Sequence, residues 1–361
     1  MKLAGPLLLA LAGCAHSDAF MADRPVGQAG PFRDTEPRQL TLNLGYDNWP
    51  AWTPDGASVY YSSQVPLPGE QDRCIDLLSH FGGTRLEIRC PRDFDGVTQE
   101  LEEPTSDGTR LAWSQAEVAV TVQAPYAISI WTAPVAGRAA PQRVLAFPYD
   151  APSGKSHAAP LYLQWIRPGV LLYLGAEVGG CCRTDTLRFG EQVVLLDVTS
   201  PTPVRTFVPG TERASAVARG EDGNSIYYTF YGDTRVYQQV LATGVVTVLH
   251  DFGAGHVARD PDVSGNRLVA VVDGKPNVQN LVPFGPVQID YGGTLVLVDL
   301  TTGVETRLVD SERYYRRPRL APGGPRLVAE GYPYVISTIS ENPPLADTSV
   351  VRISDLWILE E

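Results

Sequence analysis

The stretch Tyr46-Asp-Asn-Trp-Pro-Ala-Trp-Thr-Pro-Asp-Gly-Ala-Ser-Val-Tyr-Tyr-Ser-Ser63 decides the fold of this chain. It predicts two strands joined by a tight turn. Pro54-Asp55-Gly56 supplies the turn, because Asp and Gly tolerate the positive φ that short hairpin turns require. Val59-Tyr60-Tyr61 is β-branched and aromatic, and such residues pack well on a pleated surface. The stretch is therefore predicted to be a hairpin.

Weaker copies of this hairpin follow along the chain, so we expect a repeat protein. The copies lie roughly 40 to 60 residues apart, which is close to the period of four-stranded propeller blades. A second pair of strand-like segments follows each hairpin, as at 193–197 with 204–207. The turns of the six copies are Asp55-Gly56, Asp107-Gly108, Pro168-Gly169, Asp222-Gly223, Ser264-Gly265 and Gly323-Gly324.

The two ends of the repeat region complement each other. Residues 354–359 look like a third strand with no fourth, and residues 38–43 look like a fourth strand with no third. Pairing them would complete a last blade and remove the open sheet edges that invite aggregation. We therefore expect an all-β, six-bladed propeller over 38–361. A seven-bladed propeller remains the alternative, since the long third and fifth repeats could hide extra strands.

The unit at 50–56, preceded by Gln39-Leu40-Thr41 and Asp47, resembles the repeat of TolB-type β-propellers, also called WD40-like or PD40 repeats. The resemblance covers roughly 38–361 and is strongest in the first and sixth copies. It implies a TolB-like propeller that binds a protein or peptide partner in the bacterial cell envelope. TolB carries an α/β domain before its propeller, where this sequence predicts only a tether. TolB's own partners are therefore not carried over.

The first residues resemble the export signal of bacterial lipoproteins. Lys2 precedes an apolar run, which ends in Leu11-Ala12-Gly13-Cys14, similar to a lipobox. The resemblance implies a signal peptide over 1–13, a lipid on Cys14 and a flexible tether over 14–37. Ala15, in place of Asp, favours the outer membrane with the domain facing the periplasm. The alternatives are an ordinary secretory signal cut near Ala19, or a tail that is not processed.

The net charge of −12 argues against nucleic acid as a partner, because such binding needs Lys and Arg to displace counterions from phosphates. The same charge keeps a protein soluble through self-repulsion. We expect a monomer.

Four cysteines follow Cys14. Cys74 and Cys90 flank a predicted hairpin, whose open end brings residues within reach of a disulfide. Cys181-Cys182 could form a strained vicinal disulfide, remain free thiols or bond to a partner. No His lies at metal-ligand spacing from either cysteine, so neither a zinc site nor another cofactor is expected.

In a propeller, the segments that enter the innermost strands converge at the mouth of the central channel. Six charged or ionisable residues fall just before these strands and could bind an anionic or peptide-like ligand there. The alternative is that they only pair with one another. These residues are Asp47, His157, Arg213, His256, Asp260 and Arg317.

No Gly-x-Ser-x-Gly elbow, phosphate loop or linear catalytic triad is visible, so no catalytic residue is predicted. The sequence favours a binding or scaffolding protein of the envelope. An enzyme acting at the channel mouth, such as a lactonase-like hydrolase or a lyase, is the alternative.

Overall fold

The structure is a computed structural model of the 361-residue chain. In the part of the chain that it describes, every regular element is a β-strand. No helix of these residues is long and apolar enough to cross a membrane. The described residues are 37–42, 47–64, 73–91, 97–119, 127–136, 140–150, 155–179, 189–273, 276–281, 285–290, 292–308, 313–333 and 354–360.

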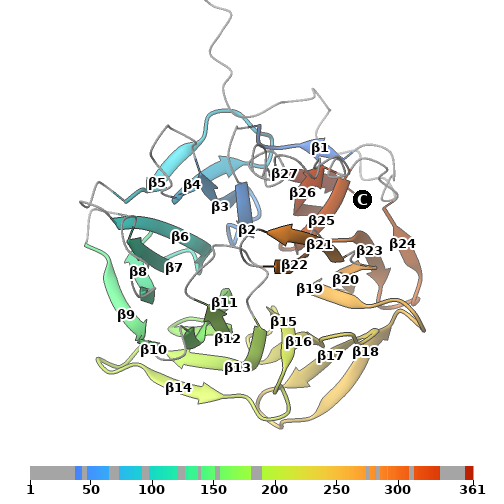
Figure 1. Ribbon diagram of the computed structural model, residues 1–361. Helices are drawn as coiled ribbons and strands as arrows, with labels where there is room; N and C mark the ends of the chain where they lie inside the picture. The colour runs from blue at the N-terminus through green and yellow to red at the C-terminus, as the bar shows by residue number, and fades with distance from the viewer. Residues whose placement is uncertain are drawn as a thin grey trace, which may run out of the picture.

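The described strands form six antiparallel groups of four, which we call blades 1 to 6. Figure 1 shows them arranged around a central axis. Blades 1 and 2 read as one continuous sheet because a single parallel bridge joins Arg73 to Glu100. From the innermost strand outward, blade 1 is β2 (Asp47–Trp52), β3 (Ser58–Gln64), β4 (Arg73–Ser79) and β5 (Leu86–Arg89), and blade 2 is β6 (Val97–Ser106), β7 (Arg110–Ala119), β8 (Ala127–Pro134) and β9 (Gln142–Phe147). Blade 3 is β11 (Lys155–Arg167), β12 (Val170–Gly179), β13 (Phe189–Asp197) and β14 (Val204–Phe207), and blade 4 is β15 (Ala214–Arg219), β16 (Ser225–Phe230), β17 (Arg235–Val240) and β18 (Val246–Asp251). Blade 5 is β19 (Ala258–Ser264), β20 (Arg267–Val272), β23 (Thr294–Asp299) and β24 (Glu305–Arg307), and blade 6 is β25 (Arg313–Leu320), β26 (Arg326–Pro333), β27 (Asp355–Glu360) and β1 (Arg38–Gln39).

The prediction of six blades is confirmed in these residues, and the extra length of two repeats is accounted for. In the third repeat, β10 (Tyr149–Asp150) pairs with the start of β11. In the fifth, β21 (Pro276–Leu281) and β22 (Gly285–Asp290) form a separate hairpin between β20 and β23. Neither addition makes a seventh blade.

The two ends of the propeller close in blade 6, as predicted. The strand β1 pairs antiparallel with β27, with Gln39 opposite Trp357. Beyond this short strand, the Leu40 amide donates to the Leu356 carbonyl at 2.7 Å, and the Leu356 amide donates to Thr41 Oγ1 at 2.9 Å. The Leu40 side chain is 1% exposed and packs in a core cluster shared by blades 1 and 6. The N-terminal segment is therefore part of the hydrophobic core.

The two faces of the propeller, at opposite ends of its central axis, differ in the connections between strands. Tight turns join the first two strands of each blade, and a glycine takes the positive φ there, as at Gly56 (66°) and Gly169 (78°). A side chain at 169 would also collide with Thr199. We call this end the turn face. The opposite end, where the innermost strands begin, we call the entry face. The strand ends at this face include those separated by the longest stretches of sequence, between β20 and β23 and between β26 and β27.

Candidate functional site

The innermost strands share a distortion that builds the lining of the channel. Each has a shift in register with its neighbour. At six bulges of these strands a residue other than glycine has a positive φ, and four of the six precede proline, which has no N–H to lose from the ladder. Such backbone is strained, and surrounding contacts must hold it. The six residues are Trp49 (56°), Glu103 (56°), Ala158 (55°), Tyr162 (58°), Asp260 (44°) and Arg317 (45°).

Arg317 makes the strongest of these contacts. Its Nη1 donates to both carboxylate oxygens of Glu330 at 2.9 Å, and both side chains are almost wholly buried. Its guanidinium also lies over the Trp49 ring, 3.3 Å from the centroid. The Glu330 carboxylate in turn accepts the Trp49 amide at 2.6 Å. A single buried ion pair therefore ties blade 6 to the bulge of blade 1.

Asp260 and Tyr162 meet across the channel. The Tyr162 hydroxyl donates to Asp260 Oδ1 at 2.5 Å, although the two residues belong to blades 5 and 3. Burial, followed by the Asp260 charge, raises the pKa of Tyr162 well above its usual 10.0. Burial also opposes ionisation of Asp260, but Arg316, the Tyr162 hydroxyl and Arg317 outweigh it and lower its pKa below 3.8. The pair is thus a carboxylate held by a neutral phenol.

Carboxylates at the bulges of the innermost strands also bond to backbone amides of the neighbouring blade. Asp260 Oδ2 accepts the Arg317 amide at 3.0 Å, and Glu103 Oε2 accepts the Leu163 amide at 2.9 Å. These acceptors satisfy amides that the bulges remove from the sheet ladder. We call Trp49, Glu103, Tyr162, Asp260, Arg317 and Glu330 the channel network. Apart from the Arg317–Glu330 pair, which lies within blade 6, the contacts described above run between blades, so the network holds the ring of blades together.

The structure locates Asp260 and Arg317 inside their strands, at the bulges, rather than just before them. The contacts described for the other four predicted residues are with residues outside the channel network. Asp47 begins β2 and is buried in the closing seam, where its amide and carbonyl bond to Ser354. His256 contacts the Asp273 carboxylate at 2.9 Å, and Arg307 reaches the same carboxylate at 3.3 Å.

His157 lies in a second cluster, on the entry face at blade 3. Its Nδ1 lies 3.2 Å from Glu191 and 3.8 Å from Glu177. One ligand atom from each of the three residues lies within 4.8 Å of the others. The Ala158 amide anchors the Glu191 carboxylate at 3.1 Å, and the exposed Arg213 donates its amide to the Glu191 carbonyl at 2.7 Å. We call His157, Glu177 and Glu191 the entry-face triad. Imidazole and carboxylate are ligands for several divalent cations.

Sequence reasoning missed Glu330, Glu103 and the two partners of His157. Glu177 and Glu191 lie on different strands from His157, so no linear spacing reveals them. The sequence does contain a signal of the bulges, because a proline recurs a few residues before the tight turn in four of the repeats. These prolines are Pro50, Pro104, Pro261 and Pro318. Proline inside a predicted inner strand indicates a bulge.

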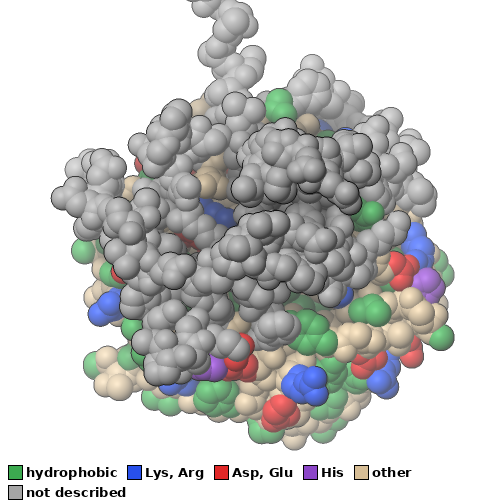
Figure 2. Space-filling view, viewed as in Figure 1, with side chains coloured by type: hydrophobic (Ala, Val, Ile, Leu, Met, Phe, Trp, Pro, Cys, Tyr) green, Lys and Arg blue, Asp and Glu red, His purple; other side chains and the backbone are tan. Residues whose placement is uncertain are grey.

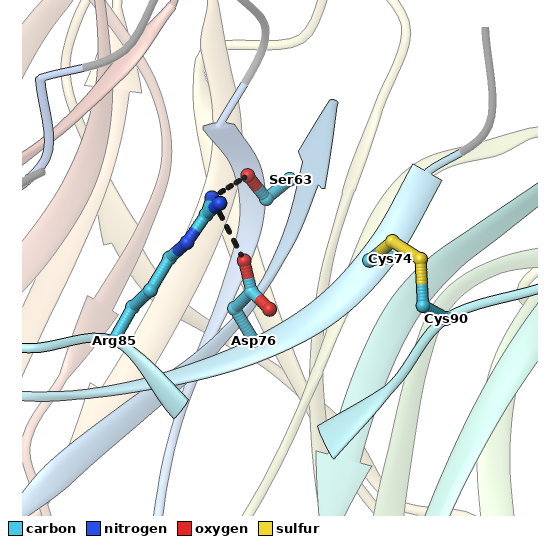
Figure 3. The surroundings of a disulfide bond; sticks show 5 residues. All are labelled: Ser63, Cys74, Asp76, Arg85 and Cys90. Carbon is cyan, nitrogen blue, oxygen red and sulfur yellow. Dashed lines mark hydrogen bonds and ion pairs between the residues drawn. A yellow bond between two sulfur atoms is a disulfide. The ribbon is translucent and has the colours of Figure 1, made fainter. Parts of the chain in front are cut away.

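The expected disulfide between Cys74 and Cys90 is present, with a Cα–Cα distance of 4.3 Å. Figure 3 shows it between β4 and β5, with Arg85 directed toward Asp76 and Ser63. The disulfide links the end of β5, the short outer strand of blade 1, covalently to β4. Cys14, Cys181 and Cys182 lie outside the described residues.

Comparison with known proteins gives the fold and no more. No family model and no curated protein matches the chain. Among solved structures, a calcium-binding protein, regucalcin, from Agrobacterium tumefaciens has a TM-score of 0.53 at 12% identity, over 90% of this chain and 93% of that one. TolB from Acinetobacter baumannii has a TM-score of 0.49 at 16% identity, and 80% of this chain covers 60% of that one. An oligogalacturonate lyase in complex with manganese has a TM-score of 0.47 at 12% identity, over 90% and 79%. The chain has the architecture of a six-bladed β-propeller.

Proposed function

We propose that this protein is a non-catalytic binding or scaffolding protein of the bacterial cell envelope, which engages a protein or peptide partner on its entry face. The observation that carries the proposal is the difference between the two faces. The turn face has connections as short as 168–169 and 265–266, whereas strand ends at the entry face are separated by residues 273–293 and 334–354. Long connections on a rigid scaffold are where binding residues concentrate.

The channel network supports the same proposal. Arg317 and Glu330 satisfy each other, and so do Tyr162 and Asp260. A catalytic acid or base has to reach a substrate proton, and the Glu330 carboxylate and the Tyr162 hydroxyl are each bonded to a neighbour in this network. The axis therefore acts as support, and the partner is expected to bind outside it.

Charge distribution fits a protein partner rather than a polyanion. Figure 2 shows acidic, basic and apolar side chains interspersed over the lower part of the view, where Figure 1 has blades 3 to 5. Together with the net charge of −12, this mixture offers no broad basic surface among the side chains described in that view.

The cellular location of the protein is part of the proposal. A lipid on Cys14 and a tether over 14–37 would hold the propeller at the outer membrane, facing the periplasm as a monomer. Metabolic labelling with a radioactive fatty acid tests it: the wild-type chain should incorporate label, and Cys14→Ser should not. Equal labelling of the two chains would remove the anchor from the proposal.

The partner can be sought by cross-linking in cells of the source bacterium, followed by purification. Arg213 and Tyr231 are exposed on the entry face, and Val245 and Val304 are exposed in turns of the other face. An Arg213→Glu/Tyr231→Ser variant should lose the cross-linked partner, while a Val245→Ser/Val304→Ser variant should keep it. Loss only in the second variant would place the binding surface on the turn face and refute the proposal.

The entry-face triad favours one second candidate, a metal-dependent hydrolase or lyase acting at that face. Its His and two Glu could hold a divalent cation, which would activate a water or polarise a carbonyl. Metal analysis of the purified protein separates the two functions. A stoichiometric divalent ion that is lost in His157→Ala would favour the enzyme.

A further inference from the structure

A pocket of about 420 Å³ opens at the seam between blades 1 and 2, away from the channel network and the entry-face triad. Blades pack face to face, but β5, the outer strand of blade 1, has only four residues. It leaves part of the facing surface of blade 2 uncovered. Its lining includes Arg89 at the end of β5 and, from blade 2, Gln99, Trp113, Gln115, Glu117 and Trp131.

Two tryptophans provide its apolar wall. Trp113 and Trp131 are directly opposite each other in the β7–β8 pairing, so their side chains share one face of the sheet. Trp113 is 2% exposed, and Trp131 is partly buried. The Trp131 Nε1 donates to Ser129 Oγ at 2.8 Å, which fixes the orientation of its ring. The wall is therefore aromatic and rigid.

A row of polar side chains lies beside this wall. Gln99 is opposite Glu117, and Leu101 is opposite Gln115, in the β6–β7 register. The Gln115 amide donates to Gln99 Oε1 and to Glu117 Oε1, each at 3.2 Å. The row combines amide donors, amide acceptors and a carboxylate, so it can both give and accept hydrogen bonds.

Two donors at the pocket are unsatisfied. Trp113 Nε1 and Arg89 Nε are buried and have no hydrogen-bond partner among the described residues. A buried donor without an acceptor is costly, and native structures seldom keep one without a reason. Both residues line the pocket, but these two atoms are enclosed by protein, so the polar atoms that a ligand can reach are those of the row described above.

We propose that this pocket binds a neutral pyranose sugar. The C–H groups on one face of a pyranose form a weakly positive apolar patch, which packs on the negative face of an aromatic ring. Its hydroxyls both donate and accept, as the row of Gln99, Gln115 and Glu117 requires. A pocket of this size lies in the range that holds small molecules. A proline-rich peptide would also stack on tryptophan, but it offers mainly carbonyl acceptors and would give the Glu117 carboxylate no donor beyond the Gln115 amide that it already has.

The disulfide belongs to this site. Cys90 lines the pocket, and its bond to Cys74 fixes the end of β5 against β4 (Figure 3). The short strand is thereby held as a fixed edge of the opening. The site is independent of the partner proposed for the entry face, so either can fail without the other.

The test is isothermal titration calorimetry of the full mature chain with cellobiose, maltose and N,N′-diacetylchitobiose, and with a hexaproline peptide. We expect at least one disaccharide to bind in the millimolar range or tighter. Trp131→Ala should weaken that binding at least tenfold, and Phe207→Ala, an exposed aromatic residue of β14, should leave it unchanged. Glu117→Gln keeps the shape of the pocket and should also weaken binding, which provides a second variant if Trp131→Ala does not fold.

The result that would overturn the proposal is equally definite. It is wrong if none of the three disaccharides binds, if only the peptide binds, or if a disaccharide binds equally well to wild type and to folded variants at Trp131 and Glu117.

Discussion

The ion pair between Arg317 and Glu330 should be among the most sensitive points in the propeller. Glu330 is fully buried, bonds twice to Arg317 and also accepts the Trp49 amide. Glu330→Gln keeps the volume of the side chain and one oxygen for that amide. It removes the charge and leaves the Arg317 guanidinium buried without its counter-ion.

Removing one partner of a buried pair costs about 3–5 kcal/mol, because the remaining charge stays desolvated. In a domain of this size, each kcal/mol lowers the melting temperature by about 2 °C. We therefore expect Glu330→Gln to melt about 6–10 °C below wild type. Arg317→Met should fall by a similar amount. The double variant Arg317→Met/Glu330→Gln has no buried charge at either position, so it should recover more than half of the summed loss.

Thermal unfolding followed by circular dichroism, completed by urea titration, measures all four corners of this cycle. Arg307→Gln is the control, because it breaks a pair with Asp273 in which both side chains are about one-third exposed. Such pairs contribute at most about 1 kcal/mol. The reasoning is refuted if the double variant loses as much stability as the two single variants together, since the two residues would then be uncoupled.

Three further predictions concern the closure of blade 6, the disulfide between Cys74 and Cys90, and the stability of the protein at low pH. Leu40→Ala should lower the free energy of unfolding by about 2–5 kcal/mol in urea titration, and Leu42→Ala, at 53% exposure, by less than about 0.5 kcal/mol; equal effects would mean that the N-terminal segment does not close blade 6. Cys74→Ala/Cys90→Ala should cost about 2–4 kcal/mol, and adding reductant to wild type should reproduce the loss, which an unchanged melting curve would contradict. The lowered pKa of Asp260 means that folding favours its ionised form, so its contribution is present above pH 3.8 and disappears as pH falls through the lower folded value. Asp260→Asn should therefore flatten the decline of stability with pH below 3.8, measured by urea titration at several pH values, and a decline as steep as in wild type would exclude this role.

The architecture could be predicted because its signals are local and repeated. A turn such as Asp55-Gly56 is specified by adjacent residues, and six copies make each one more certain. The closure in blade 6 could also be predicted, since a lone third strand and a lone fourth strand have no other partner. The pairing of Cys74 with Cys90 follows from the same hairpin geometry.

The sites could not be predicted in the same way, because their residues meet only in three dimensions. Glu330 lies on the second strand of blade 6 and satisfies an amide of blade 1, at the far end of the chain. His157 finds Glu177 and Glu191 on two neighbouring strands. The pocket at Trp131 exists because β5 is short, and the effect of that length on a neighbouring blade is a property of packing.

The positions of the charged residues along the chain pointed to the mouth of the channel, and two of them, Asp260 and Arg317, belong to the channel network. Their strained backbone requires strong local contacts, and those contacts engage the Asp260 carboxylate and the Nη1 of Arg317. A residue held at positive φ by a buried carboxylate is fixed in place, which suits closure of a ring better than turnover of a substrate. Recognition is then expected where polar groups are less fully committed, on the entry face and in the seam between blades 1 and 2.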